Sequence, residues 1–419
     1  MDLQVQGDTY QFDLGAGIVI EVERLTEDSG GLTGEITIAD HSGLGTRLLH
    51  SARLNLMSTQ SRNGLVKSLE KAKPDYPWYK TLEEVCFLAK DRFRQGDPIL
   101  ELGQLPPCPT PRWLLHPFAE HGGPTVLFGD GGTGKSFLAL AIAASIAGGY
   151  NILGTLKVQP VPVLYLDWET NEYTHDQRVA AICRAVDRPV PRGIFYRRQV
   201  TSLASSVDNL RREIVRLKVG FVIIDSLGAA LGGEPEKASE TLAVFTAARS
   251  LGVAWLGLAH ITKGNASNGD AKKPFGSVFG HNMARMTWGA EAAQEEGDDF
   301  KGITMTNHKA NNGRLQKPFT VRLQFHNDDS DELQAVDIQR CDVTEFPTLA
   351  AKLPLRQRIL SALRGGLRTY EELTEETGAP YEQLKGRMAE LVRSGAVVKI
   401  PLGKSASFGL SAGREASPF

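Results

Sequence analysis

Residues 129–136 constrain this chain more than any other segment. They read Gly-Asp-Gly-Gly-Thr-Gly-Lys-Ser, a full match to the phosphate-binding pattern G-x-x-x-x-G-K-[ST]. Glycines allow backbone N–H groups to turn toward an anion, and a following helix presents its positive dipole end to the same anion. The apolar run 125–128 before the motif and the Ala-rich segment 136–147 after it supply the required strand–loop–helix context.

The motif predicts a nucleoside triphosphate site with Mg²⁺, which we take to be an ATP site. Lys135 is expected to reach the β- and γ-phosphates, and the Ser136 hydroxyl is expected to ligate the metal. The alternative, a Gly-rich turn that binds no ligand, does not account for the flanking strand and helix. The expected phosphate-binding residues are Gly129, Asp130, Gly131, Gly132, Thr133, Gly134, Lys135 and Ser136.

Short apolar runs alternate with helix-length segments through the middle of the chain. The runs cover residues 125–128, 163–166, 221–224 and 253–258. Near-continuous apolar strands separated by helices are typical of a parallel sheet that is covered on both faces. The sequence therefore predicts an α/β core over residues 113–348.

Two of these apolar runs end in acids. Asp225 closes the run 221–224, where it is placed to hold Mg²⁺ beside the phosphate loop. No acid follows Asp225 directly, so the base that activates water must come from another strand. Glu169, just after the run 163–166, is our candidate for that base, and the alternative for Glu169 is a helix-capping or salt-bridged carboxylate.

The flanking regions differ from this core in composition. Residues 1–103 show alternating strand patterns followed by a helical segment, and we expect a small α+β domain for assembly or partner docking. The Pro-rich stretch 104–112 is typical of a stiff linker. Residues 349–419 predict three helices and a hairpin, which is the order of a winged helix; a small helical packing domain is the alternative.

Bulk properties exclude several other classes of protein. The chain has 419 residues and a formal net charge of -2, so its overall charge does not argue for nucleic-acid binding. It contains no apolar stretch long enough to cross a membrane and no leader pattern at Met1, so a cytoplasmic location without a membrane partner is expected. The four cysteines have no paired spacing, so we expect neither disulfides nor a zinc site.

The order of these motifs resembles a known family. A P-loop, a strand ending at Glu169, a strand ending at Asp225 and a strand ending in residues 259–263 resemble the RecA-like superfamily. The sequence is closest to the RepA-type branch of hexameric replicative helicases, among AAA_25-type ATPases. The resemblance covers residues 113–345 and is strongest in the P-loop, in residues 165–169, and in Gly-Ser at 276–277 with Arg285 downstream.

The resemblance implies further catalytic residues. In that family the histidine after the fourth strand senses the γ-phosphate, which would be His260, although a buried core histidine is the alternative. The arginine after Gly-Ser reaches the neighbouring subunit's nucleotide, which would be Arg285, although a surface salt bridge is the alternative. Hexameric helicases also carry a Lys-x-Arg pair; Lys309 fits it, but Asn311 stands where the second cation belongs, which leaves the cis or trans assignment open.

The resemblance also implies nucleic-acid contacts and a ring. In RecA-like rings, loops corresponding to 228–240 and 262–275 line the pore and hold single-stranded DNA, with Lys263, Lys272 and Lys273 as phosphate contacts; a solvated loop explains the same composition. A winged helix would bind duplex DNA or a protein through its third helix, where Lys385 and Arg387 lie.

Two functions follow from these patterns. The first is an ATP-hydrolysing DNA motor that forms a homo-oligomeric, hexameric ring, translocates on single-stranded DNA and unwinds duplex, serving a mobile element. The second is an ATP-gated switch that binds DNA or protein and hydrolyses slowly.

Overall fold

The computed structural model describes residues 1–6, 8–96, 99–107, 112–154, 160–234, 237–261, 278–402 and 405–411. The chain divides into two compact units, Met1–Pro109 and Thr110–Phe419. This division lies inside the Pro-rich stretch 104–112 of the sequence. Each unit is described by itself below.

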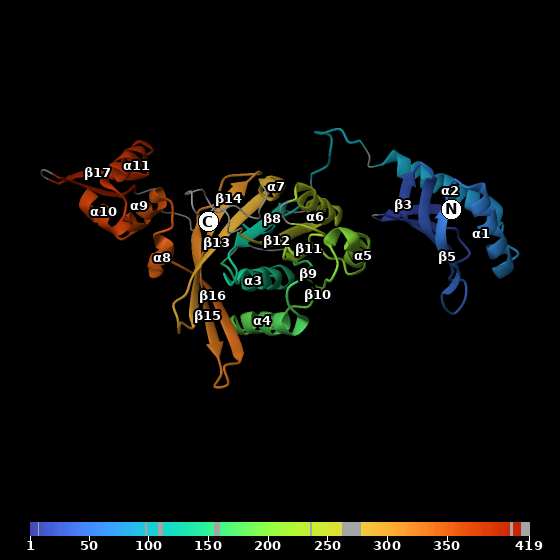
Figure 1. Cartoon of the computed structure of the whole chain (residues 1–419), viewed down its shortest axis with the longest axis horizontal. Helices are drawn as coiled ribbons and strands as arrows, with labels where there is room; N and C mark the ends of the chain where they lie inside the picture. Colours follow the sequence, from blue (N-terminus) through green and yellow to red (C-terminus); the bar gives the residue numbers. More distant parts are fainter. Residues whose placement is uncertain are drawn as a thin grey trace. The chain divides into compact units, whose positions relative to one another are not determined.

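The N-terminal unit is a five-stranded antiparallel sheet with two helices against one face (Figure 1). Its strands and helices are β1 (Asp2–Gln6), β2 (Thr9–Asp13), β3 (Ile18–Asp28), β4 (Gly31–Asp40), β5 (Arg47–Asn55), α1 (Thr59–Ala72) and α2 (Trp78–Gln95). Alternation places Ile18, Ile20 and Val22 of β3 in the core, because successive side chains of a strand point to opposite faces. The predicted helical segment forms two helices, because the chain between them contains Pro74 and Pro77, which interrupt helical hydrogen bonding.

The second unit is built around a nine-stranded sheet in the order β10-β9-β11-β12-β8-β13-β14-β15-β16. The first six strands in this order, from β10 to β13, run parallel to one another. The last three, β14, β15 and β16, are each antiparallel to the strand before them. The strands are β8 (Pro124–Gly129), β9 (Val163–Asp167), β10 (Ile194–Arg198), β11 (Phe221–Asp225), β12 (Ala254–His260), β13 (Met286–Ala293), β14 (Phe300–Ala310), β15 (Phe319–Asn327) and β16 (Leu333–Cys341). A short hairpin of β6 (Trp113–Leu115) and β7 (Ala119–Glu120) precedes β8.

Helices cover both faces of the parallel part of this sheet (Figure 1). On one face lie α3 (Lys135–Gly148) and α4 (Glu172–Ala185); on the other lie α5 (Leu203–Arg216) and α6 (Ala238–Ser250). Every residue of β9 and of β11 is buried, which is why these strands are apolar on both faces. The predicted parallel α/β core is confirmed.

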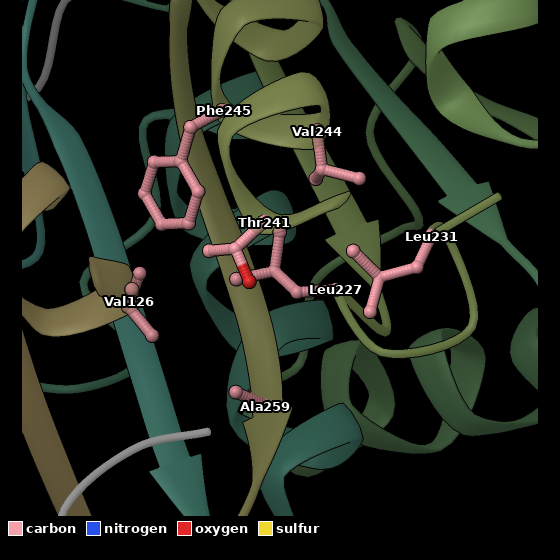
Figure 2. A pocket seen from close by; sticks show the side chains of 8 residues that line it. Val126, Leu227, Leu231, Thr241, Val244, Phe245 and Ala259 are labelled. Carbon is pink, nitrogen blue, oxygen red and sulfur yellow. The ribbon is translucent and has the colours of Figure 1, made fainter. Parts of the chain in front are cut away.

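A small gap remains in the packing of α6 against the sheet. Its volume is about 10 Å³, which is about the space of one water molecule. Figure 2 shows the apolar side chains that surround it, with Thr241 on α6 facing Val126 of β8. The Thr241 hydroxyl is buried without a hydrogen-bond partner among the described residues. The gap is a packing feature of the core and is too small for an organic ligand.

The short helix α7 (Val278–Met283) precedes β13. After β16, the second unit ends in helices and a hairpin: a 3-10 turn (Val343–Glu345), α8 (Pro347–Ala350), α9 (Leu355–Arg364), α10 (Tyr370–Thr377), α11 (Tyr381–Arg393) and the antiparallel strands β17 (Val397–Leu402) and β18 (Ser405–Leu410). Residues 355–410 have a core of their own, centred on Ile359, Leu384 and Phe408. Thr369 and Glu372 form a capping box at the start of α10. The assignment of this region as a winged helix stays a prediction.

Among the described residues, no helix combines the length and the apolar character that a membrane crossing requires.

Candidate nucleotide site

The glycine-rich loop joins β8 to α3 at the carboxyl edge of the parallel strands. Gly132 and Gly134 have φ of +73° and +90°, which is a left-handed conformation that side chains with a Cβ rarely adopt. A Cβ on Gly134 would also meet Ile303 Cδ1 of β14 at 2.8 Å, and one on Gly129 would meet the carbonyl oxygen of Ala290 at 2.6 Å. The loop therefore requires glycine both for its turns and for its close contact with β13 and β14.

Two lysines donate to carbonyl oxygens of this loop. Lys135 is buried, with 6% of its surface exposed, and its Nζ lies 3.0 Å from the Gly129 oxygen and 2.8 Å from the Asp130 oxygen. Lys301, at the start of β14, donates to the Gly132 oxygen at 2.8 Å. Burial lowers the pKa of both ammonium groups, and nearby Asp225 partly opposes this for Lys135.

The two predicted metal ligands are in direct contact. The Ser136 hydroxyl donates to Asp225 Oδ2 at 2.9 Å, and the Tyr165 hydroxyl donates to the same oxygen at 2.6 Å. Burial raises the pKa of the Asp225 carboxyl, while the hydrogen bonds from Tyr165 and Ser136 lower it. A hydroxyl and a carboxylate beside a phosphate loop are the hard oxygen ligands that Mg²⁺ prefers, so these residues fit the metal.

Glu169 and His260 complete the group at this edge. The Ser226 hydroxyl donates a short hydrogen bond to Glu169 Oε1, and His260 Nε2 lies 3.4 Å from the same oxygen. Their side chains are 42% and 48% exposed, so both are open to a ligand, and His260 is not a core residue. The sheet order explains the meeting, because β9, β11 and β12 are adjacent parallel strands whose carboxyl ends share one edge.

Arg285 and Lys309 lie at the opposite edge of the sheet. The Arg285 backbone N–H donates to the Pro124 oxygen, at the start of β8, and Lys309 pairs with Thr287 across β13 and β14. The five steps from Pro124 to Gly129 rise about 3.3 Å each, so roughly 17 Å of β8 separates Arg285 from the phosphate loop. The Lys309 ammonium donates to the carbonyl oxygens of His281 and Asn282, which directly precede this end of β13, so it too points away from the loop.

The predicted nucleic-acid contacts are only partly within the described residues. Lys263, Lys272, Lys273 and Gly-Ser 276–277 lie outside them. Lys385 and Arg387 are exposed on α11, and Arg387 is paired with Glu390 at 2.5 Å.

Several partners of the site were not predicted from the sequence. Tyr165, Asp167, His175, Ser226 and Lys301 each contact a predicted site residue or its neighbour. Asp167 had a visible signal, since it ends an apolar strand just as Asp225 does. The others become site residues only through the order of strands in the sheet.

Comparisons with known proteins found matches to the central region of the chain. Residues 91–266 match the model of the AAA_25 family, described as an AAA domain, and this span contains the P-loop, Glu169, Asp225 and His260. Among solved structures, the KaiC-like protein PH0186 from the hyperthermophilic archaeon Pyrococcus horikoshii OT3 is similar at 14% identity and a TM-score of 0.37, over 53% of this chain and 93% of that one. No curated protein matches the sequence. The matched region, with its P-loop and its acids at strand ends, is thus similar to an AAA-type P-loop ATPase domain.

Proposed function

We propose that this protein is a ring-forming DNA motor that hydrolyses ATP, translocates on single-stranded DNA and unwinds duplex in the manner of a replicative helicase. We further propose that it serves the replication of a mobile element from the cytoplasm. One observation carries the proposal: the phosphate loop with its acids occupies one edge of the sheet, and Arg285 with Lys309 occupies the other. A complete set of catalytic groups therefore needs two copies of the chain.

Each residue at the nucleotide edge has a role in hydrolysis. Lys135 exchanges its bonds to the loop carbonyls for the β- and γ-phosphate oxygens. Glu169 accepts a proton from the attacking water, and His260, next to Glu169 Oε1, reports the presence of the γ-phosphate. Ser136 and Asp225 would hold Mg²⁺, which would neutralise phosphate charge.

Arg285 acts on the nucleotide of a neighbouring copy. Its side chain is exposed and has no carboxylate partner among the described residues. An unpaired guanidinium presented by one subunit can stabilise the charge that develops on another subunit's phosphoryl group. A closed ring, which we take to be hexameric, supplies one such arginine to every nucleotide.

DNA would enter through the loops that follow β11 and β12. His260 is the last residue of β12 and adjoins the predicted DNA loop 262–275, which lies outside the described residues. DNA bound next to the end of β12 would change the contact of His260 with Glu169. This connection supports ATP turnover that depends on DNA. Duplex DNA or a protein remains our proposed partner for residues 349–419, and assembly or docking our proposed role for residues 1–103.

The second candidate function is an ATP-gated switch with slow hydrolysis. Two observations favour it: Ser226, which is not an acid, follows Asp225, and Asn311 replaces the second cation of the Lys-x-Arg pair. Both substitutions remove charge that a fast motor would use.

Turnover and unwinding assays separate the two functions. For a motor we expect ATP turnover to rise with single-stranded DNA and a forked duplex to separate, with the Lys135→Ala protein as the inactive control. Mass-based sizing with ATP and single-stranded DNA should show a closed ring. ATP turnover that stays constant at saturating single-stranded DNA, at every salt concentration, would contradict the motor and leave the switch.

A further inference from the structure

A buried carboxylate lies directly beneath the turn that carries Glu169. Asp167 is the last residue of β9, and its surface is 0% exposed. It precedes Glu169 by two residues, and α4 begins three residues after Glu169. The turn is therefore short and is attached to Asp167 at one end and to α4 at the other.

Hydrogen-bond donors surround both oxygens of Asp167. Oδ1 accepts from the backbone N–H of Glu169 at 2.9 Å and from that of Thr170 at 3.2 Å. Oδ2 accepts from the Tyr196 hydroxyl at 2.9 Å and lies 3.3 Å from His175 Nε2. Burial alone would raise the pKa of Asp167, but these donors outweigh it and hold the pKa below its usual value. The group is thus an ionised acceptor.

The same carboxylate connects Glu169 to the metal ligand Asp225. The His175 ring, on α4, packs on the Tyr165 ring with centroids 4.6 Å apart. Tyr165 in turn donates to Asp225 Oδ2. The backbone N–H of Trp168 donates to the backbone carbonyl oxygen of Asp225 at 2.8 Å. Asp167, His175 and Asp225 lie close enough to suggest a metal cluster. The donors already bound to Asp167 favour a hydrogen-bonding role instead, because a metal would have to displace them.

We propose that Asp167 is a positioning residue for ATP hydrolysis: its carboxylate fixes the backbone of Glu169, and so holds the catalytic carboxyl beside the phosphate loop. This inference rests on the proposed role of Glu169. Asp167 lies beneath the turn and acts only through Glu169.

The Asp167→Asn substitution tests this role with little change in size. One anionic oxygen becomes an amide nitrogen, which can no longer accept from the surrounding donors, so the turn shifts. Misplacing a catalytic group by about 1 Å costs roughly a hundredfold in rate. We expect kcat to fall about ten- to a hundredfold, with the affinity for a non-hydrolysable ATP analogue little changed. The matched control is Asp176→Asn, which alters an exposed carboxyl on α4 and should leave kcat unchanged.

A double-mutant comparison distinguishes positioning from a general structural effect. If Asp167 acts through Glu169, then Asp167→Asn should cause no further loss of kcat in a Glu169→Gln protein. An equal loss in both backgrounds, or a loss of analogue binding that accounts for the whole effect, would overturn the positioning role while leaving the ATPase assignment intact. If Glu169→Gln itself hydrolyses ATP normally, the proposed base and this inference both fail.

A second variant covers the case in which Asp167→Asn does not fold. Tyr196→Phe removes a single donor to Asp167 and keeps the ring that lies 5.7 Å from His175. Loss of one hydrogen bond of about 1 kcal/mol predicts a drop in kcat of about fivefold. The drop should vanish in the Glu169→Gln background; if it persists there, the inference is wrong.

Discussion

The two edges of the central sheet differ in the partners of their charged side chains. At the nucleotide edge, Asp225 and Glu169 each accept hydrogen bonds from neighbouring hydroxyls. At the other edge, Arg285 has no carboxylate partner among the described residues, and Lys309 donates only to the carbonyl oxygens of His281 and Asn282, at 2.9 and 2.8 Å. Because Lys135 likewise donates to carbonyl oxygens, the two edges differ in their acids and in the exposed Arg285 rather than in their lysines. The exposed guanidinium supports the proposal that Arg285 meets an anion from outside its own chain.

The largest effect that tests this comparison is expected at Arg285. Loss of an arginine that stabilises a neighbour's phosphoryl group lowers turnover by about 10³-fold or more, so Arg285→Ala should bind ATP yet hydrolyse almost none. Arg285→Lys keeps the charge but loses the forked geometry, and should recover only part of the rate. Mixing Arg285→Ala with Lys135→Ala protein should restore some turnover, since one subunit supplies the arginine and the other an intact loop. No recovery at any mixing ratio would argue that the opposite edge has no catalytic role.

A somewhat smaller loss of ATP turnover is expected when Glu169 is replaced. Removal of a general base slows hydrolysis by about 10²- to 10⁴-fold, so Glu169→Gln should bind ATP and barely turn it over. Because the defect lies within one subunit's site, mixing this variant with Arg285→Ala protein should also restore part of the activity. Normal hydrolysis by Glu169→Gln would show that the base comes from elsewhere.

Lys135 should affect binding more directly than the other residues. A charge-assisted hydrogen bond to phosphate contributes about 2–3 kcal/mol, or roughly 30- to 160-fold in affinity. We therefore expect Lys135→Ala to weaken ATP binding by this factor in equilibrium titration. Lys67→Ala, which removes an exposed lysine of α1, is the control and should leave ATP binding unchanged. Equal weakening in both variants would contradict a direct contact between Lys135 and the phosphates.

The smallest effect is expected at Tyr165, whose hydroxyl donates to the predicted metal ligand Asp225. Tyr165→Phe removes one hydrogen bond to Asp225, worth about 1 kcal/mol, and should change the Mg²⁺ concentration needed for half-maximal turnover by about fivefold. Tyr173→Phe is the matched control, because that hydroxyl is on the exposed surface of α4, where the residue is 79% exposed. An identical Mg²⁺ response in both variants would show that the hydrogen bond does not tune the site.

Local patterns predicted much of the core. The apolar runs at 163–166 and 221–224 became β9 and β11 within one residue, because strands buried on both faces cannot hide polar side chains. The N-terminal sheet was harder: β1 and β5 lie at its edges, where β5 alternates poorly between buried and exposed positions. The antiparallel strands β15 and β16 were also missed, since their pairing depends on contacts far apart in the chain.

The site residues, too, divide into those that a local motif identifies and those that depend on the order of strands in the sheet. The phosphate loop is a contiguous motif, so its eight residues were visible in the sequence. Asp225 and Glu169 were found because each follows a buried strand. Ser226 and Tyr165, in contrast, are ordinary core or turn residues until the strand order brings β9 beside β11 and places their hydroxyls on the carboxylates of Glu169 and Asp225.

The path of β14 has a mechanical consequence. Lys301, the second residue of β14, contacts the phosphate loop, and Lys309 follows eight residues later at the far side of the sheet. The backbone between them spans about 26 Å; it pairs with β15 up to Met305 and with β13 from Gly302 onward. In the proposed ring, this one strand would connect the phosphate loop of a subunit to the residues that face the next subunit.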